Sequence, residues 1–258
     1  MKILLTLLVT FFAGMGAGLG TGFAGMSAAA VISPLLITFL GMEPYMAVGI
    51  ALSSDVLASA VSAYTYKKNG NLDVKNGLIM MVSVLVFTVV GSWVSSLVPS
   101  TTMGTFSVFM TFLLGIKFIV RPVMTTKEAM QGVSAKKRAI QSVVCGIFIG
   151  FICGFVGAGG GMMMLLILTS VLGYELKTAV GTSVFIMAFT AFTGAVSHFA
   201  IGGTPDWTVW ILCVIFTLLW ARIAAVFANK ATPKTLNRVT GVILVILGIV
   251  VMAFSMFA

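Results

Sequence analysis

One segment of this chain reads Gly154-Phe155-Val156-Gly157-Ala158-Gly159-Gly160-Gly161 and runs directly into the apolar residues Met162-Met163-Met164-Leu165-Leu166. Five of its first eight residues are glycine. Each glycine in a helix interior costs about 1 kcal/mol relative to alanine, so a helix is expected to break here. If the break lies at membrane depth, the backbone N–H groups that open the next helix can face an anion.

The composition around this segment is that of an integral membrane protein. Of 258 residues, 60% are hydrophobic and 8% are charged, whereas a soluble domain carries about 25% charged residues. The apolar runs are continuous and lack the alternation of membrane barrels, so they are predicted to be helices. The predicted fold class is therefore an all-α polytopic membrane protein.

The net charge of +9 does not indicate nucleic-acid binding. Most basic residues lie in short gaps between apolar segments, where the positive-inside rule places them, and they form no patch with aromatic residues. The three cysteines (Cys145, Cys153 and Cys213) lie in apolar runs without metal-ligand spacing. The 17 methionines form no array supported by cysteine or histidine. We therefore expect no metal, no cofactor and no nucleic-acid partner.

The chain repeats itself at a shift of 132 residues. Under that shift Gly14, Gly18, Gly22 and Gly25 fall on Gly146, Gly150, Gly154 and Gly157, and Ala47-Val48-Gly49 falls on Ala179-Val180-Gly181. One residue later in register, Asp73 falls on Asp206. We predict a first transmembrane repeat at 1–121, a cytoplasmic linker at 122–137 and a second repeat at 138–258.

Each unit contains five apolar segments. They are 3–24, 26–41, 44–66, 75–98 and 102–121 in the first unit, and 138–157, 161–172, 175–200, 206–228 and 235–257 in the second. Spanning a bilayer takes about 20 apolar residues, so 26–41 and 161–172 are predicted to be short broken or re-entrant helices after the Gly-rich stretches. Short, glycine-interrupted segments at matching places in two repeats indicate a transporter binding site. The ten segments leave eight to ten full crossings.

Loop charges indicate that the two units insert in opposite directions. Loop 66–75 carries three lysines and is expected in the cytoplasm, whereas the matching loop 201–207 carries no lysine or arginine. The next pair reverses, because 98–102 is uncharged and 229–234 is basic. The units are therefore predicted to be inverted repeats in the cytoplasmic membrane, with both chain termini external.

Small and hydroxyl-bearing residues near the Gly-rich stretches are the predicted substrate-binding groups. Ser53 and Ser54 follow Gly49, and Thr182 and Ser183 follow the matching Gly181. Such hydroxyls can donate to an oxyanion or bond a carbonyl of their own helix, and both interpretations stay open here. The predicted set is Gly25, Ser27, Ser53, Ser54, Gly159, Gly160, Gly161, Thr182 and Ser183.

Three ionisable residues inside apolar segments are candidates for function. Asp55 lies mid-segment, where a charge costs at least ~2.5–3.5 kcal/mol, so it should face the bundle interior. Asp55 and His198 are the candidate proton-coupling groups; a packing role is the alternative for each. Arg222 is a candidate anion contact, with snorkelling to the interface as its alternative.

These segments resemble the TauE/SafE sulfite exporter family of membrane transporters over nearly the whole chain. The resemblance rests on Gly22-Phe23-Ala24-Gly25-Met26-Ser27 with Pro34, on the stretch from Gly154 to Gly161, and on Ala179-Val180-Gly181-Thr182-Ser183. The first unit departs from the pattern, because it has Ile50-Ala51 where the second has Thr-Ser. The resemblance implies transport of sulfite, organosulfonates or related small anions such as carboxylates.

We expect a secondary transporter that moves a small oxyanion by alternating access, with the proton as candidate coupling ion. No catalytic constellation is visible, so an enzyme is not expected. The expected partners are the small anion and the lipid bilayer, and a homo-oligomer stays open. The alternatives are a passive anion channel, which needs a continuous wet path, and a membrane scaffold without a substrate.

Overall fold

The computed structural model describes residues 2–95, 112–113, 115–156, 160–202 and 205–255. Within these ranges all regular structure is α-helical. The helices are α1 (Lys2–Ala24), α2 (Ala29–Leu40), α3 (Pro44–Lys68), α4 (Val74–Ser95), α6 (Lys127–Gln131), α7 (Ala135–Val156), α8 (Gly160–Ser170), α9 (Leu176–Gly202), α10 (Trp207–Lys230) and α11 (Pro233–Ser255). In the described part, α1, α3, α4, α9, α10 and α11 are long and apolar enough to cross a membrane. The predicted all-α membrane class is confirmed.

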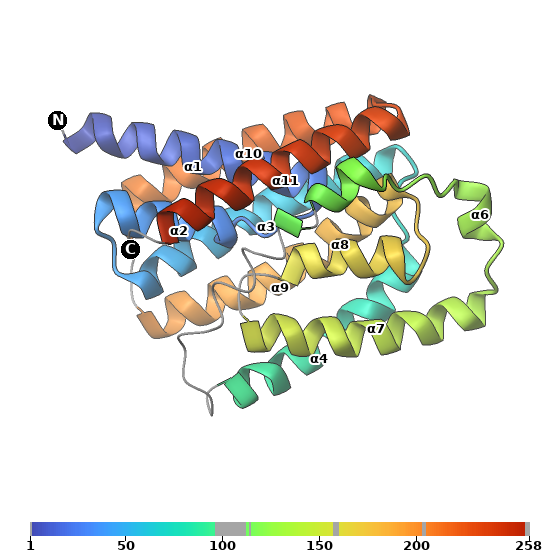
Figure 1. Ribbon diagram of the computed structural model, residues 1–258. Helices are drawn as coiled ribbons and strands as arrows, with labels where there is room; N and C mark the ends of the chain where they lie inside the picture. Colours follow the sequence, from blue (N-terminus) through green and yellow to red (C-terminus); the bar gives the residue numbers. More distant parts are fainter. Residues whose placement is uncertain (1, 96–111, 114, 157–159, 203–204, 256–258) are drawn as a thin grey trace.

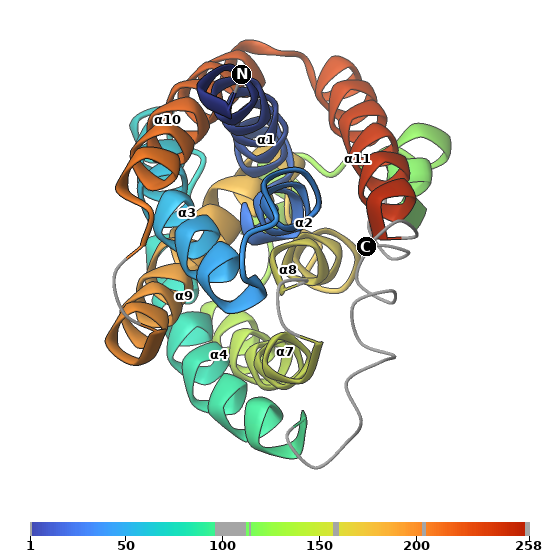
Figure 2. The same ribbon diagram turned by 90° about the vertical axis from the view of Figure 1, so that its left-hand side faces the viewer.

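The two short helices lie in the middle of the bundle. Figure 2 shows α2 and α8 inside the arrangement of longer helices, and Figure 1 shows that they lie one after the other along the bundle. In that arrangement α1 packs on α10, α4 packs on α7, and α3 packs on both α9 and α10. The core of the molecule is therefore built around the two short helices that follow the Gly-rich stretches.

Glycines allow the closest of these helix contacts. A Cβ on Gly14 would lie 2.6 Å from Phe216 Cβ, and one on Gly18 would lie 2.6 Å from the carbonyl oxygen of Thr217. Gly146 and Gly150 face α4 in the same way, at 2.8 Å from Ser83 Cβ and 2.5 Å from the Val84 carbonyl oxygen. Small residues at spacing four permit this approach of helix backbones in membranes.

Acidic side chains cap three of the long helices. Glu43 accepts hydrogen bonds from Tyr45 N and Met46 N at the start of α3, where Pro44 occupies the first turn. Asp206 accepts from the backbone of Thr208 and Val209 at the start of α10. The Asp73 carboxylate accepts from Asn76 N at the start of α4. Carboxylates at these positions offset the positive end of each helix dipole.

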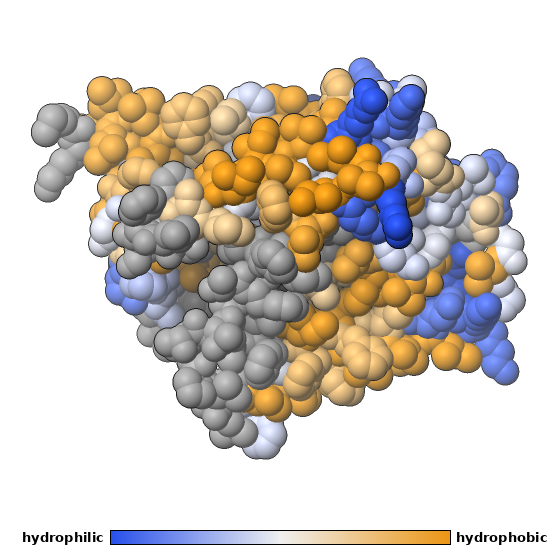
Figure 3. Space-filling model, in the orientation of Figure 1, coloured by the Kyte–Doolittle hydropathy of each residue, from blue (hydrophilic) through white to orange (hydrophobic). Residues whose placement is uncertain are grey.

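The outer surface separates an apolar belt from one polar end. Large apolar side chains are exposed along the outer helix faces, including Val86, Phe148 and Ile246. Figure 3 shows hydrophilic side chains gathered at the end of the molecule where α6 lies, and both chain termini lie toward the opposite end in Figure 1. This division suits a bundle whose sides face lipid.

The start of α7 differs slightly from the sequence prediction. The predicted apolar segment begins at residue 138, but α7 begins three residues earlier, at Ala135. Ser134 Oγ accepts from Lys137 N at 3.4 Å and so caps the helix three residues earlier. The predicted linker 122–137 therefore contains α6 and the first turn of α7.

Candidate functional site

The first Gly-rich stretch interrupts the helical structure between α1 and α2. Gly25, which follows the last residue of α1, has a φ of 61°, a conformation that favours glycine. Hydroxyl groups bond the carbonyls around this break: Tyr66 Oη donates to Gly22 O at 2.9 Å, Thr240 Oγ1 to Phe23 O at 3.2 Å, and Thr21 Oγ1 to Met26 O at 2.8 Å. The irregular backbone inside the bundle is thus satisfied by protein groups, which is what a bilayer interior would require.

The second Gly-rich stretch touches the first. A side chain on Gly161 would collide with the carbonyl oxygen of Gly25 and would lie 3.1 Å from Ser27 N. Ser183 on α9 joins the two backbones, because its Oγ donates to Gly25 O at 3.2 Å and lies 3.4 Å from Gly161 O. We call this point, defined by Gly25, Gly161 and Ser183, the glycine crossing.

Two half-length helices start at the glycine crossing and run apart. Figure 1 shows α2 running toward the end that holds the chain termini and α8 running toward the end that holds α6. At 1.5 Å per residue they are about 18 Å and 16 Å long, so together they match a hydrocarbon core of about 30 Å. A helix N-terminus carries about half a positive charge, so two such charges face one another in the middle of the molecule.

Asp55 supplies the counter-charge for the first of these helices. Its Oδ2 accepts from Ser27 Oγ at 2.8 Å and from Ala28 N at 3.1 Å, and its Oδ1 accepts from Ser59 Oγ at 2.8 Å. The side chain is fully buried. Asp55 therefore lies at the start of α2, and Ser27, a predicted substrate-binding residue, already donates to the carboxylate.

The start of α8 has no equivalent carboxylate. All six acidic residues of the chain lie in its described part. Five of them lie in α6 or at the ends of helices, and Asp55 alone lies inside a long helix. The position on α9 that matches Asp55 is Met187, which is buried. The positive end of α8 therefore lacks the internal partner that α2 has.

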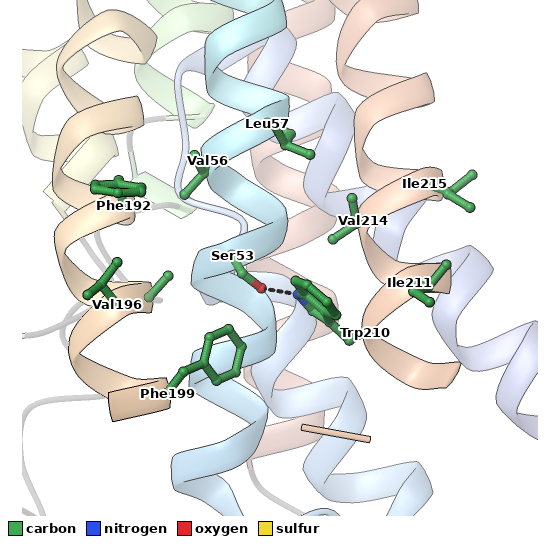
Figure 4. Close-up of a pocket in the computed structure, with 11 residues that line it drawn as sticks. Ser53, Val56, Leu57, Phe192, Val196, Phe199, Trp210, Ile211, Val214 and Ile215 are labelled. Atoms are coloured by element: carbon green, nitrogen blue, oxygen red, sulfur yellow. Dashed lines mark hydrogen bonds between the residues drawn. The ribbon is translucent and has the colours of Figure 1, made fainter. Parts of the chain in front are cut away.

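The paired serines of the first unit bond their own helix. Ser54 Oγ and Ser53 Oγ both donate to Ile50 O at 2.8 Å, as hydroxyls inside helices commonly do. Ser53 Oγ also accepts from Trp210 Nε1 at 2.6 Å. Figure 4 shows this pair in an otherwise apolar cavity of about 360 Å³ between α3, α9 and α10. Neither serine makes a hydrogen bond to the glycine crossing.

The other predicted residues are placed as follows. Thr182 is buried, and its Oγ1 accepts from Asp73 N at 3.2 Å, so adjacent Thr182 and Ser183 serve different contacts. Arg222 is exposed on α10. Gly160 is the first residue of α8, whereas Gly159 and the side chain of His198 lie outside the described residues.

Several residues that complete this site were not singled out from the sequence. Ser59, four residues after Asp55, had a detectable signal, because residues at that spacing share a helix face. Tyr66 and Thr240 had no signal in the sequence, because each reaches a carbonyl oxygen of α1 only after the helices pack.

These features define a class of protein. A helical bundle with six helices in its described part that are long and apolar enough to cross a membrane, and with two short helices whose N-termini meet in the middle of the molecule, resembles the architecture of a membrane transporter. The match to a family model is more specific: residues 10–251 fit the description "Sulfite exporter TauE/SafE". The chain belongs to the TauE/SafE sulfite exporter family of membrane transporters, as its sequence features predict.

Curated relatives carry transporter names. The chain is 25% identical over 244 residues to "Probable membrane transporter protein YunE" of Bacillus subtilis, covering 90% of this chain and 89% of the relative. It is 26% identical over 256 residues to a "Probable membrane transporter protein" of Haemophilus influenzae, covering 98% and 93%. Both names give the transporter class without a substrate.

Proposed function

We propose that this chain is a secondary transporter that moves a small oxyanion, such as sulfite, an organosulfonate or a carboxylate, by alternating access. The observation that carries the proposal is the meeting of two half-helix N-termini at the glycine crossing. Backbone N–H groups and the helix dipole favour an anion at such a position. The family description, a sulfite exporter, supports the same class of substrate.

The unequal ends of α2 and α8 favour an asymmetric binding site. Asp55 already offsets the positive charge at the start of α2, whereas α8 begins at Gly160 without a carboxylate partner. In the proposal, the substrate anion takes the place at the start of α8 that Asp55 takes at α2. Gly160 and Gly161 then supply backbone donors, and the Ser183 hydroxyl turns from Gly25 O to the anion.

Asp55 is the proposed proton-coupling group. In its ionised form the carboxylate accepts three hydrogen bonds. A proton on Oδ2 turns the acceptor of Ser27 and Ala28 into a donor, which weakens the hold on the start of α2. Protonation of Asp55 would therefore loosen one side of the glycine crossing. His198 stays a second candidate for the coupling group.

We further propose that residues 1–121 and 138–258 are inverted repeats joined by a cytoplasmic linker at 122–137. The helix contacts support a twofold relation between the two units. Helix α1 of the first unit packs on α10 of the second, and their repeat equivalents, α7 and α4, also pack on each other. Asp73 and Asp206, matched in the repeat, both begin helices. In Figure 1, α1 and α7 run in opposite directions along the bundle.

A labelling experiment tests this topology. Exposed Lys68 is the last residue of α3, and exposed Thr208 is the second residue of α10. In Figure 1 the end of α3 and the start of α10 lie at opposite ends of the bundle. With Cys145, Cys153 and Cys213 replaced by alanine, an impermeant maleimide should label Thr208→Cys in intact cells. It should label Lys68→Cys only in inside-out vesicles. Labelling of both positions from the same side would contradict the inverted insertion.

A passive channel is less well supported than a transporter. Gly25 and Gly161 are in backbone contact at the glycine crossing, with Ser183 bonded to Gly25. Such a contact favours a barrier at this depth over a continuous wet path. Alternating access is the mode of transport that fits a barrier of this kind, because a rearrangement of one half against the other opens it.

Uptake into proteoliposomes tests the proposed function. Purified protein should take up at least one of sulfite, a small organosulfonate and a small carboxylate, with saturation and with counterflow when the vesicles are preloaded. Channel flux neither saturates at low concentration nor shows counterflow. A scaffold moves none of these anions, so the absence of uptake and of binding across all three would refute the oxyanion proposal.

A further inference from the structure

A polar cavity lies at the basic end of the molecule, away from the glycine crossing. Its volume is about 680 Å³, and its walls come from the α3–α4 turn, the start of α4, the linker, α7 and α9. The polar side chains that line it are Asp73, Lys75, Asn76, Lys127, Arg138 and Thr178. Figure 3 shows hydrophilic side chains concentrated at this end.

The cavity has an excess of positive charge. Three cationic residues and one acidic residue line it. The acid is already engaged, because the Asp73 carboxylate accepts from Asn76 N at 3.1 Å, from Asn76 Nδ2 at 2.7 Å and from Tyr174 Oη at 2.8 Å. Lys127 Nζ donates to Gly70 O at 3.1 Å, which places its charge at the rim. A neutralising anion is therefore favoured inside the cavity.

Arg138 distinguishes this cavity from an ordinary basic membrane surface. A residue that only satisfies the positive-inside rule keeps its charge in water, but Arg138 is 6% exposed. Its guanidinium lies over the ring of Tyr174, 4.9 Å from the centroid. Burial, followed by the Asp73 carboxylate, raises the pKa of Tyr174 above its usual range. The phenol therefore keeps its proton and holds Asp73.

The backbone of the α3–α4 turn lies between the cavity and the part of α9 that contacts the glycine crossing. Asp73, which lines the cavity, donates its backbone N–H to Thr182, and Thr182 is the neighbour of Ser183. The carbonyl of Asn71 packs directly on Gly181, and Asn71 Nδ2 donates to Asn229 Oδ1 at 2.6 Å. The α3–α4 turn thus lies between the two sites.

We propose that this cavity is an anion-binding vestibule, which holds a small soluble oxyanion on the cytoplasmic side of the α3–α4 turn before or after it passes the glycine crossing. The proposal rests on the oxyanion transport proposed above. Lys75 and Lys127 contact the anion from the rim, and Arg138 sets the positive potential at the cavity wall. The site is distinct from the glycine crossing, because no residue that defines the crossing lines the cavity.

Titration calorimetry with inorganic sulfate as the probe tests the vestibule, using the full chain in zwitterionic lipid nanodiscs. The double variant Lys75→Gln/Lys127→Gln should bind sulfate about tenfold more weakly, the sum of two partly screened charge contacts. The matched control is Lys136→Gln/Lys137→Gln, which removes the same charge from exposed positions on α7 that do not line the cavity. Its affinity should equal that of the wild type.

Equal losses in the two double variants, or no sulfate binding by the wild type, would overturn the vestibule. Because Lys127 bonds Gly70, the single variant Lys75→Gln guards against misfolding and should lose about threefold. In nanodiscs with phosphatidylglycerol, unchanged sulfate binding supports a soluble anion, whereas its abolition assigns the cavity to a lipid headgroup and overturns the proposal. Uptake assayed after reconstitution of the same purified variants into proteoliposomes separates the hypotheses. Lysine-dependent sulfate binding without transport would refute the transport proposal alone. Transport without lysine-dependent binding would refute the vestibule alone.

Discussion

Gly161→Ala is expected to reduce transport to the background level and to lower the free energy of unfolding by about 3 kcal/mol. Overpacking of a close contact typically costs 1–3 kcal/mol, and the upper end applies here because the added Cβ meets backbone atoms. The carbonyl oxygen of Gly25 and the amide nitrogen of Ser27 are the atoms in its way, and neither can rotate aside. The α2 and α8 starts would have to separate at the point where the substrate is proposed to bind.

The matched control for this variant is Gly16→Ala on α1. A Cβ on Gly16 would lie 3.2 Å from Leu247 Cδ2 and from Val31 Cγ1, which are the ends of side chains that can adjust. Its helical position also gains about 1 kcal/mol in propensity, so transport and stability should stay close to the wild type. Uptake in proteoliposomes and thermal unfolding in detergent measure both properties. Full transport by Gly161→Ala would contradict the glycine crossing.

The glycine pattern predicted where the helices break, and the substrate site is proposed at these breaks. Five glycines in the stretch from Gly154 to Gly161 each disfavour a regular helix by about 1 kcal/mol relative to alanine, and α7 does end within it. The alignment of this stretch with Gly22 and Gly25 identified the second break. Periodicity and composition suffice for such features because they depend on local backbone preference.

The contacts within the site could not be predicted in the same way. Asp55 and Ser27 lie on different elements, and their hydrogen bond exists only because α2 folds back beside α3. Thr182 and Ser183 looked equivalent in sequence, yet one faces Asp73 and the other faces the glycine crossing. Adjacent helical residues point about 100° apart, so partners on neighbouring helices decide their roles.

The sequence predicted that the two halves differ chemically, but not which contact the difference produces. The sequence places Asp55 opposite Met187 in the repeat, and that difference predicts a chemically unequal pair of half-sites. It does not reveal that the carboxylate occupies the α2 N-terminus, the position first assigned to backbone donors for the substrate. Only the packed structure shows that one of the two expected anion positions is filled from within the chain.

Asp55→Asn is expected to uncouple transport from the proton gradient while preserving exchange. The amide oxygen can still accept from Ala28 N, but the amide nitrogen cannot accept a hydrogen bond, so one of three bonds is lost. Ser59 can turn to a carbonyl of its own helix, which limits the loss of stability to about 1–2 kcal/mol. An amide does not titrate, so uptake driven by an imposed pH gradient should fall to the leak level. Counterflow of the same anion between preloaded vesicles and medium should remain.

Asp55→Leu provides the comparison that separates coupling from packing. Leucine leaves Ala28 N and the Ser27 hydroxyl without an acceptor in a fully buried position, so this variant should lose about 3 kcal/mol or more, along with both modes of transport. If Asp55 only fixes the start of α2, a folded Asp55→Asn protein still responds to the pH gradient as the wild type does, and that result would remove Asp55 as the coupling group. If it carries the proton, the gradient response disappears in Asp55→Asn while the fold and the exchange reaction survive. Stability and coupling then separate at a single carboxylate, because its hydrogen bonds from Ser27 and Ala28 fix the start of α2 and its protonation weakens them.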